Sequence, residues 1–229
     1  MQIRPGSGAL TLATAIGPDG ERRCRWCIAT PEYIAYHDAE WGFPVGDDRR
    51  LFEKLSLEGF QAGLSWRTIL AKRERFRTVF HHFDYERIAR FGARDVERLL
   101  QDSGIVRHRG KIEAVIHNAH CAQELLAREG SLAAFIWRYE PERRRAPSTA
   151  ATSPESVALS KALKRLGWRF VGPTTVYAFM QAMGLVNDHA HGCVIRADAE
   201  RARERFSRPA LSAPAKHAAS ARRPRAHSL

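Results

Sequence analysis

Hydrophobic positions recur at helical spacing along most of the chain, and the polar breaks between them are short. In the segment 110–129, one apolar stripe at this spacing is formed by Ile112, Val115, Ile116, Ala119 and Leu126. No run of alternating apolar and polar residues predicts a β-hairpin. The pattern therefore predicts an all-α fold, and no internal repeat is visible.

Capping residues predict where these helices begin. Asp47 or Asp48 can cap one helix and Ser65 the next, while Ser153 and Gly172, each followed by proline, open two later ones. The stretch "EPERRRAPSTAATSP" between the later helices predicts a flexible loop. Helices are expected over residues 49–63, 66–80, 85–91, 93–101, 110–129, 155–166 and 174–185.

Length and composition predict one main domain with an extension at each end. A chain of 229 residues with 44% hydrophobic residues can bury a core of its own. We expect a flexible extension over residues 1–20, a helical domain over 21–196, and a basic, disordered tail over 197–229. The four cysteines are too few for a secreted disulfide framework, and no stretch approaches the ~20 apolar residues of a membrane span. A monomer in a reducing cytosol is expected.

Positive charge predicts a polyanionic partner. The net charge is +12 and the pI is near 10.2. The segment 196–229 holds nine basic and three acidic residues, so it carries +6, half of the excess. This segment is either an arm that binds nucleic acid or a solvated tail without a specific partner.

A first candidate site is the stretch "LLQDSGIVRHRGKI", residues 99–112, which predicts two helices joined by a tight turn. The N-terminus of the second helix would present backbone N–H groups that can bind phosphate. Arg107, Arg109 and Lys111 add positive charge there, while Ile105 and Val106 can plug the turn into the core. The alternative is an ordinary turn between helices with a solvated basic face.

A second candidate site is "LEGFQAGLSW", residues 57–66, where Glu58 and Gln61 interrupt an apolar helix end just before Trp66. A buried carboxylate needs a partner, so Glu58 reaches solvent, pairs with a cation or serves a ligand. Stacked aromatic rings beside a carboxylate would make a slot for a purine, and the candidate rings are Trp26, Tyr36, Trp41 and Trp66. Plain core packing is the alternative for each ring.

Cysteines and histidines near both ends of the predicted domain form a third candidate site. A closed structural zinc site takes four Cys or His ligands, and a clamp of this kind could tie the two ends together. The spacing matches no familiar zinc-finger pattern, so buried thiols and surface histidines remain an alternative. The candidate ligands are Cys24, Cys27, His37, His189, His191 and Cys193.

Taken together, the three sites resemble the 3-methyladenine DNA glycosylase I family. Four blocks match in order: "CRWC...YIAYHDAEWGFPV", "LFEKLSLEGFQAGLSWRTIL", "GIVRHRGKI" and "ALSKALKRLGWRFVGPTTVYAFMQAMGLVNDHAHGC". The resemblance covers residues 21–193 and implies a helix-hairpin-helix fold. It also implies a monofunctional enzyme that hydrolyses the N-glycosidic bond of 3-methyladenine in alkylated double-stranded DNA.

The resemblance also implies roles for individual residues. Structural zinc would be held by Cys24, His37, His189 and Cys193, with Cys27 and His191 not required. In the base pocket Glu58 would accept hydrogen bonds from the purine and Trp66 would stack on it, with Tyr36, Trp26 and Gln61 as further lining. Gly63 and Leu64 would fill the gap left in the duplex. The hairpin, with Gly104, Arg107, Arg109, Gly110 and Lys111, would contact DNA.

A labile substrate explains how so few groups would suffice. Methylation at N3 makes the nucleoside cationic, so the base departs neutral and needs little acid catalysis. No Asp occurs between Asp102 and Asp188, where other helix-hairpin-helix glycosylases carry a catalytic Asp, and narrow specificity for 3-methyladenine follows. The alternatives are a noncatalytic, zinc-stapled DNA-binding protein and a nucleotide-binding regulator. A carboxylate in an aromatic slot favours the enzyme, because Glu58 would repel phosphate.

Overall fold

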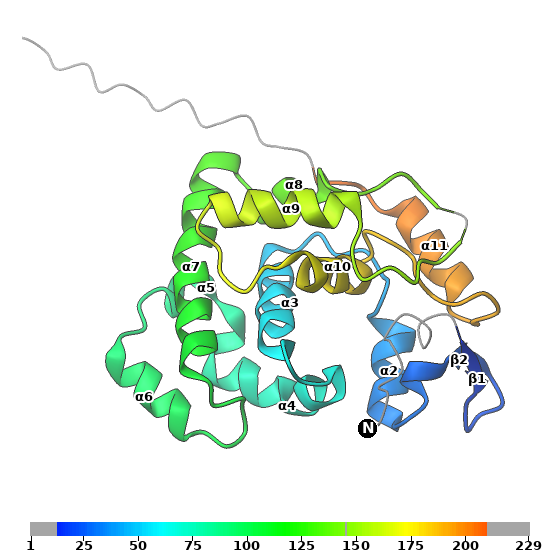
Figure 1. Ribbon diagram of the computed structural model, residues 1–229, viewed down its shortest axis with the longest axis horizontal. Helices are drawn as coiled ribbons and strands as arrows, with labels where there is room; N and C mark the ends of the chain where they lie inside the picture. The colour runs from blue at the N-terminus through cyan, green and yellow to red at the C-terminus, as the bar shows by residue number, and fades with distance from the viewer. Residues whose placement is uncertain (1–12, 145, 210–229) are drawn as a thin grey trace, which may run out of the picture.

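The computed structural model describes residues 13–144 and 146–209, and this part of the chain is mostly helical (Figure 1). Two short strands come first, β1 (Thr14–Ile16) and β2 (Arg22–Cys24). Two 3-10 helices are η1 (Arg25–Cys27) and η2 (His81–Phe83). The α-helices are α2 (Pro31–Ala39), α3 (Asp48–Gln61), α4 (Trp66–Val79), α5 (Tyr85–Ile88), α6 (Ala93–Gln101), α7 (Arg109–Glu129), α8 (Leu132–Trp137), α9 (Pro154–Arg165), α10 (Pro173–Ala182) and α11 (Arg196–Arg205).

The predicted helix starts are confirmed where a side chain can cap them. Asp47 accepts a hydrogen bond from the backbone of Arg50, and Ser65 accepts one from Thr68. Ser153 caps α9 in the same way. Each of these residues satisfies a backbone N–H that the first turn of a helix leaves without a partner. The stripe of α7 is also confirmed, since its residues are buried or packed against the core.

The fold is mostly helical, as predicted, but a β-hairpin that the sequence did not predict lies at the N-terminal end. Strands β1 and β2 pair antiparallel, with Thr14 opposite Cys24. The turn between them contains Gly20 at a φ of 83°, a conformation that glycine adopts without strain. Each strand has only three residues, too few for an alternating pattern to stand out in the sequence. The folded part thus includes residues 13–20 of the predicted extension.

The folded part also continues past residue 196. Helix α11 buries Arg203, whose guanidinium donates hydrogen bonds to the carbonyls of Gly184 and Leu185. Beyond the helix, the ring of Phe206 lies 4.5 Å from that of Trp137, centroid to centroid. Residues 197–209, which were predicted to belong to the tail, are therefore part of the folded domain. The remainder of the predicted tail, 210–229, and residues 1–12 of the predicted extension lie outside the described residues.

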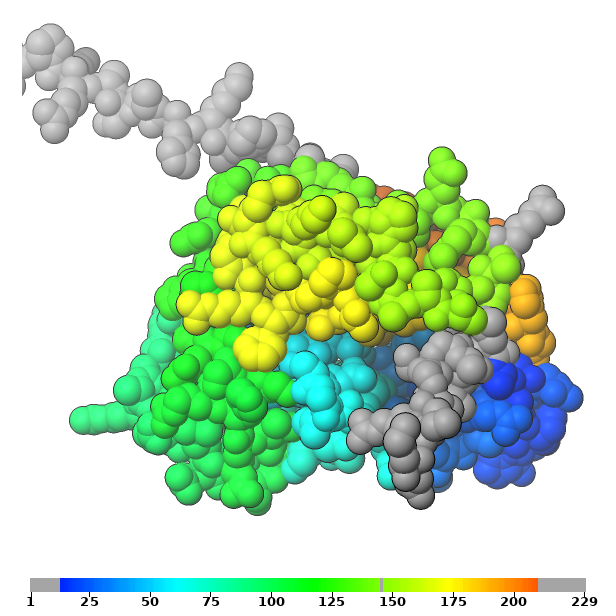
Figure 2. All heavy atoms as spheres, viewed as in Figure 1, coloured from blue at the N-terminus to red at the C-terminus, as the bar shows by residue number. Residues whose placement is uncertain are grey.

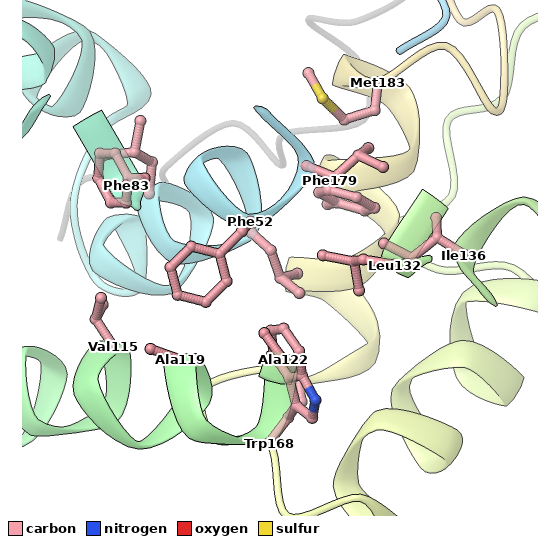
Figure 3. Packing of buried hydrophobic residues seen from close by; sticks show 14 of the residues in the cluster. Phe52, Phe83, Val115, Ala119, Ala122, Leu132, Ile136, Trp168, Phe179 and Met183 are labelled. Atoms are coloured by element: carbon pink, nitrogen blue, oxygen red, sulfur yellow. The ribbon is translucent and has the colours of Figure 1, made fainter. Parts of the chain in front are cut away.

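Helix α3 lies at the centre of the core and is in contact with α4, α7, α8 and α10. Figure 3 shows Phe52 of α3 between α7 and α10, close to the indole ring of Trp168. Figure 2 shows the segment of α9 and the following loop, in yellow, lying against α7 and α3. Because α3 is enclosed in this way, its residues 55–60 are all buried. Within the described residues, no helix has both the length and the apolar character needed to cross a membrane.

Candidate active site

Helix α3 buries a carboxylate at the centre of the second candidate site. Glu58 is 5% exposed, and its Oε1 atom lies 2.9 Å from the Nζ atom of Lys54, one turn earlier on the helix. Lys54 is equally buried. The partner that Glu58 needs is therefore a lysine, which was not among the predicted site residues, although its i, i+4 spacing to Glu58 is a visible signal in the sequence.

Aromatic rings from three elements surround this ion pair. Tyr36 of α2 accepts a hydrogen bond from Lys54, with 2.8 Å between Nζ and the phenol oxygen. Trp66, the first residue of α4, has its ring centroid 5.3 Å from that of Tyr36. Trp26 of η1 packs edge-on against Trp41. Burial raises the pKa of Tyr36 well above its ordinary value, so its phenol stays neutral.

A cavity of about 420 Å³ opens between these groups. All five residues predicted to bind the base line it: Trp26, Tyr36, Glu58, Gln61 and Trp66. The remaining lining comes from Tyr33, Trp41, Lys54, Ser65, Ala178 and Gln181. The two residues of α10 among these could not be assigned from the sequence, because no polar pattern on that helix marks the face that meets α3.

The loop between α3 and α4 projects beside the cavity. Gly63 has a φ of 81°, and the side chain of Leu64 is 43% exposed. A second hollow of about 200 Å³ runs from Glu58 and Gln61 past Gly63 and Leu64 to the start of α10. The two residues predicted to fill a gap in the duplex thus lie at the mouth of the predicted base slot.

The connection between α6 and α7 has the predicted compact form. The backbone N–H of Gly104 donates to the carboxylate of Asp102, and Ile105 is buried in the core. Arg107 is exposed and has no carboxylate partner within the described part of the chain. Arg109 is also exposed, but its guanidinium contacts two carboxylates, those of Glu97 and Glu113. Arg107 is therefore the more available cation for a phosphate.

Lys111 does not lie where it was predicted, which was at the surface as a contact for DNA. Its ammonium is buried and donates hydrogen bonds to the carbonyl oxygens of Phe60, at 3.0 Å, and Ala62, at 2.6 Å. These carbonyls end helix α3 and have no partner within that helix, so a cation stabilises them. Lys111 therefore does not present its charge at the surface, and its contact instead fixes the loop that carries Gly63 and Leu64.

The third candidate site brings three of the four predicted metal ligands together. The ligand atoms of Cys24, His37 and Cys193 lie within 4.8 Å of one another, and all three residues are buried. His189 packs against this group, with its ring centroid 4.9 Å from that of His37. Its Nδ1 atom lies 3.0 Å from the amide oxygen of Asn187. Its Nε2 atom is buried without a hydrogen-bond partner in the described structure.

This orphaned nitrogen is the observation that tests whether a metal fits. Burial lowers the pKa of His189 to about 3, so the imidazole is neutral. Because Nδ1–H can donate to Asn187, Nε2 keeps a free lone pair, on a ring that packs against the ring of His37. Leaving a buried acceptor unsatisfied costs about 1–3 kcal/mol. A Cys₂His₂ donor set with this vacant lone pair suits zinc, and the residues present therefore fit the metal.

Polar groups behind the cluster orient its ligands. The Nδ1 atom of His37 lies 2.7 Å from the carboxylate of Asp38, and Arg23 donates to both oxygens of that carboxylate. A carboxylate behind a ligating histidine is a common arrangement in zinc sites. Cys27 is fully buried and also contacts His37, whereas His191 is exposed. Cys27 lies outside the group of three close ligand atoms.

Comparison with known proteins gives consistent results. A family model described as methyladenine glycosylase matches residues 26–197. DNA-3-methyladenine glycosylase 1 of Escherichia coli (strain K12) is 49% identical over 177 residues, which cover 75% of this chain and 95% of that protein. A crystal structure of a 3-methyladenine DNA glycosylase I superposes with a TM-score of 0.72 at 52% identity, covering 75% of this chain and 98% of the other. A structure of 3-methyladenine DNA glycosylase I from Staphylococcus aureus, described as showing how 3-methyladenine is recognised, has a TM-score of 0.73 at 36% identity and covers 76% and 96%.

Proposed function

The chain belongs to the methyladenine glycosylase family, and on that premise we propose that it excises 3-methyladenine from alkylated DNA. The reaction is hydrolysis of the N-glycosidic bond, which leaves an abasic site and begins base excision repair. The observation that carries this proposal is the cavity of about 420 Å³ in which a buried carboxylate and an indole ring lie together. A purine can stack on Trp66 while its amino group donates to Glu58.

The chemistry needs little more than this slot. N3-methylation gives the nucleoside a positive charge, and breaking the bond between the sugar and the base returns that electron pair to the base, which leaves neutral. Water then supplies the hydroxyl at the sugar carbon and releases a proton. A carboxylate 4 Å from a cation contributes about 4 kcal/mol at an effective dielectric of about 20, which favours the cationic base. Glu58 would thus accept a hydrogen bond from the reacting base.

Flipping the base out of the duplex costs free energy, and the loop between α3 and α4 can offset part of this cost. Unstacking and unpairing cost a few kcal/mol, and stacking on an aromatic ring returns roughly 1–3 kcal/mol. The exposed Leu64, with Gly63 beside it, would fill the space that the flipped base vacates. We further assign the connection between α6 and α7 to a helix-hairpin-helix element that holds the DNA backbone, with Gly104, Arg107, Arg109 and Gly110 as its contacts.

We also propose that Cys24, His37, His189 and Cys193 hold one structural zinc ion. A closed site with four protein ligands supplies a cross-link and takes no part in bond cleavage. The close group of three ligand atoms and the orphaned Nε2 atom of His189 support this assignment. The expectations of a monomer acting on duplex DNA in the cytosol belong to the same proposal, and the four free cysteines, all buried, suit a reducing compartment.

Release of free base tests the proposed function. Wild-type protein should release 3-methyladenine from methylated duplex DNA, and Glu58→Gln and Trp66→Ala should each reduce that rate by roughly tenfold to a hundredfold while binding of the duplex persists. Glu124→Gln, which changes an exposed glutamate on α7, is the matched control and should match the wild type. DNA binding without any release by the wild type would favour a noncatalytic DNA-binding protein.

A further inference from the structure

Lys54 occupies the point of the slot where a cation would bind. Its Nζ atom lies 3.2 Å from the centroid of the Trp66 ring and 2.9 Å from the Glu58 carboxylate. The first distance lies well within the ~6 Å limit of a cation–π contact, and the second is that of a charge-assisted hydrogen bond. Any base that stacks on this face of Trp66 and bonds Glu58 must therefore take the place of the ammonium.

Charged groups from three helices surround the lysine. Glu58 lies on its own helix, α3, Tyr36 and Glu40 come from α2 and its C-terminal end, and Arg73 comes from α4. Burial lowers the pKa of Lys54, while Glu58 and Glu40 oppose this shift and Arg73 adds to it. Tyr36 is neutral, so Glu58 is the anionic group in direct contact with the ammonium.

The groups behind the lysine do not offer it an equivalent partner. A small hollow of about 30 Å³ adjoins it, and its wall includes the carboxylates of Glu40 and Glu53. Glu40 is already bound by both terminal nitrogens of Arg73, at 2.7 and 2.8 Å. Glu53 is bound by Arg77 at 2.8 Å. A displaced ammonium would exchange its contact with Glu58 for carboxylates that already have cations, so displacement is unfavourable without compensation.

Resting on the function proposed above, we propose that Lys54 is an intramolecular competitor for the cation position beside Glu58. The cationic base of the intact nucleoside displaces it, because that base brings a positive charge to the carboxylate. Once the glycosidic bond breaks, the base is neutral and no longer balances Glu58. The ammonium then returns and favours departure of the product. Lys54 is thus a specificity-determining residue whose effect changes with the charge of the base.

Binding of free 3-methyladenine provides a test that does not depend on excision. At about pH 8, Lys54→Met should bind the free base about tenfold more tightly than the wild type, because methionine removes the charge and keeps an unbranched side chain. An exposed lysine of α9 supplies the control, and Lys161→Met should bind like the wild type. Weaker or equal binding by Lys54→Met would overturn the proposal. Thermal melting of each variant establishes that it is folded.

Excision kinetics distinguish the proposed role of Lys54 from a purely structural one, because the proposal predicts a change in KM without a change in the single-turnover rate. Lys54→Met should have a lower KM for methylated duplex and stronger inhibition by free 3-methyladenine, while its single-turnover rate at saturating enzyme stays within about twofold of the wild type. A fall in the saturated rate comparable to that of Glu58→Gln would instead place Lys54 in the catalytic machinery and overturn the proposal. An inactive wild type that still shows the difference in base binding would contradict only the proposed function.

The wild-type protein alone gives a second measurement should Lys54→Met not fold. Burial lowers the pKa of Lys54, so raising the pH from about 7 to about 10 increases the neutral fraction of its amine, and the affinity for free 3-methyladenine should rise with pH. The Tyr36 phenol, with its raised pKa, remains neutral over this range, and Arg73 remains charged. An affinity that is constant or falls over the same range would overturn the proposal.

Discussion

The sulfur atom of Cys193 lies 3.5 Å from the Nε2 atom of His37, although 156 residues separate the two in sequence. Cys24, at the end of β2, completes the group, and its sulfur accepts a hydrogen bond from the backbone of Ala190. Residues from the β-hairpin, from α2 and from the segment before α11 therefore meet in one buried cluster. An ion bound here would cross-link both ends of the folded domain.

The first prediction concerns metal content. The purified protein should contain one zinc ion per chain, and Cys24→Ser and His189→Gln should each lose it, because each removes one of four ligands. Elemental analysis measures this directly. Cys27→Ser is the control and should keep its zinc, since the resemblance to the family does not require that thiol as a ligand. Full zinc in Cys24→Ser, or none in the wild type, would contradict the assignment.

Removing the metal should destabilise the fold. A chelator strong enough to strip zinc would leave His189 Nε2 and the two thiols buried without their ligand and would free both ends of the domain. We expect the melting temperature to fall by at least about 5 °C, which corresponds to about 2 kcal/mol for a chain of this size. Calorimetry before and after removal, with zinc re-added as the control, checks this. An unchanged melting temperature in protein verified to be metal-free would show that the cluster is stable on its own.

Two basic residues of the α6–α7 region should behave differently on substitution. Arg107→Gln removes an exposed cation, so it should weaken duplex binding and reduce the slope of log K against log salt by about 1 without changing stability. Lys111→Met removes the hydrogen bonds to Phe60 and Ala62. It should lower the free energy of unfolding by about 1–3 kcal/mol and leave the salt slope unchanged. Reversed outcomes for the two variants would mean that Lys111 is the phosphate ligand.

Lys111 also shows how far a sequence can predict such a site. Residue types and order were enough to predict the helix starts and a group of residues that line one cavity, because capping, periodicity and resemblance are all recorded locally. The direction in which a long basic side chain points is not recorded in the local sequence. Lys111 lies in a basic stretch, yet it is four residues before Val115 on the buried face of α7. Its partners, the last carbonyls of α3, are visible only when the two helices are packed.

Lys54 and the β-hairpin were missed for related reasons. The i, i+4 spacing of Lys54 and Glu58 is visible in the sequence, but such pairs usually lie on solvated surfaces, and only the packing of α2 and α4 around α3 buries this one. The β-hairpin has a turn signal in Pro18, Asp19 and Gly20. Each strand has only three residues, and Cys24 at the end of β2 packs in a buried cluster with Ala190 and Cys193.

Leu64 should act on excision without contributing to stability. Leu64→Ala removes an exposed side chain, so the free energy of unfolding should change by less than about 0.5 kcal/mol. The excision rate on methylated duplex should fall roughly tenfold, because the gap left by the flipped base would no longer be filled. Ile16→Ala, which shortens an exposed apolar side chain on β1, should leave the rate unchanged. Equal rates for Leu64→Ala and the wild type would exclude the gap-filling role.

Two C-terminal truncations should separate the predicted tail from the folded domain. Residues 210–229 contain four basic residues and no acidic one. Deleting them should leave the melting temperature and the fraction of 3-methyladenine excised unchanged. The affinity for duplex DNA should fall and depend less on salt, because binding would release fewer counterions. An unchanged salt slope would show that this segment is a solvated tail without a role in DNA binding.

The longer truncation, removal of 202–229, should behave differently because it cuts into the domain. It deletes Arg203, which is buried and bonded to the carbonyls of Gly184 and Leu185, and Phe206, which packs on Trp137. Loss of these contacts should lower the free energy of unfolding by about 2 kcal/mol or more. Chemical denaturation of both truncations, compared at equal salt, measures this. If the longer truncation were as stable as the shorter one, the contacts of Arg203 and Phe206 would contribute little, and the domain would end near residue 201 in energetic terms.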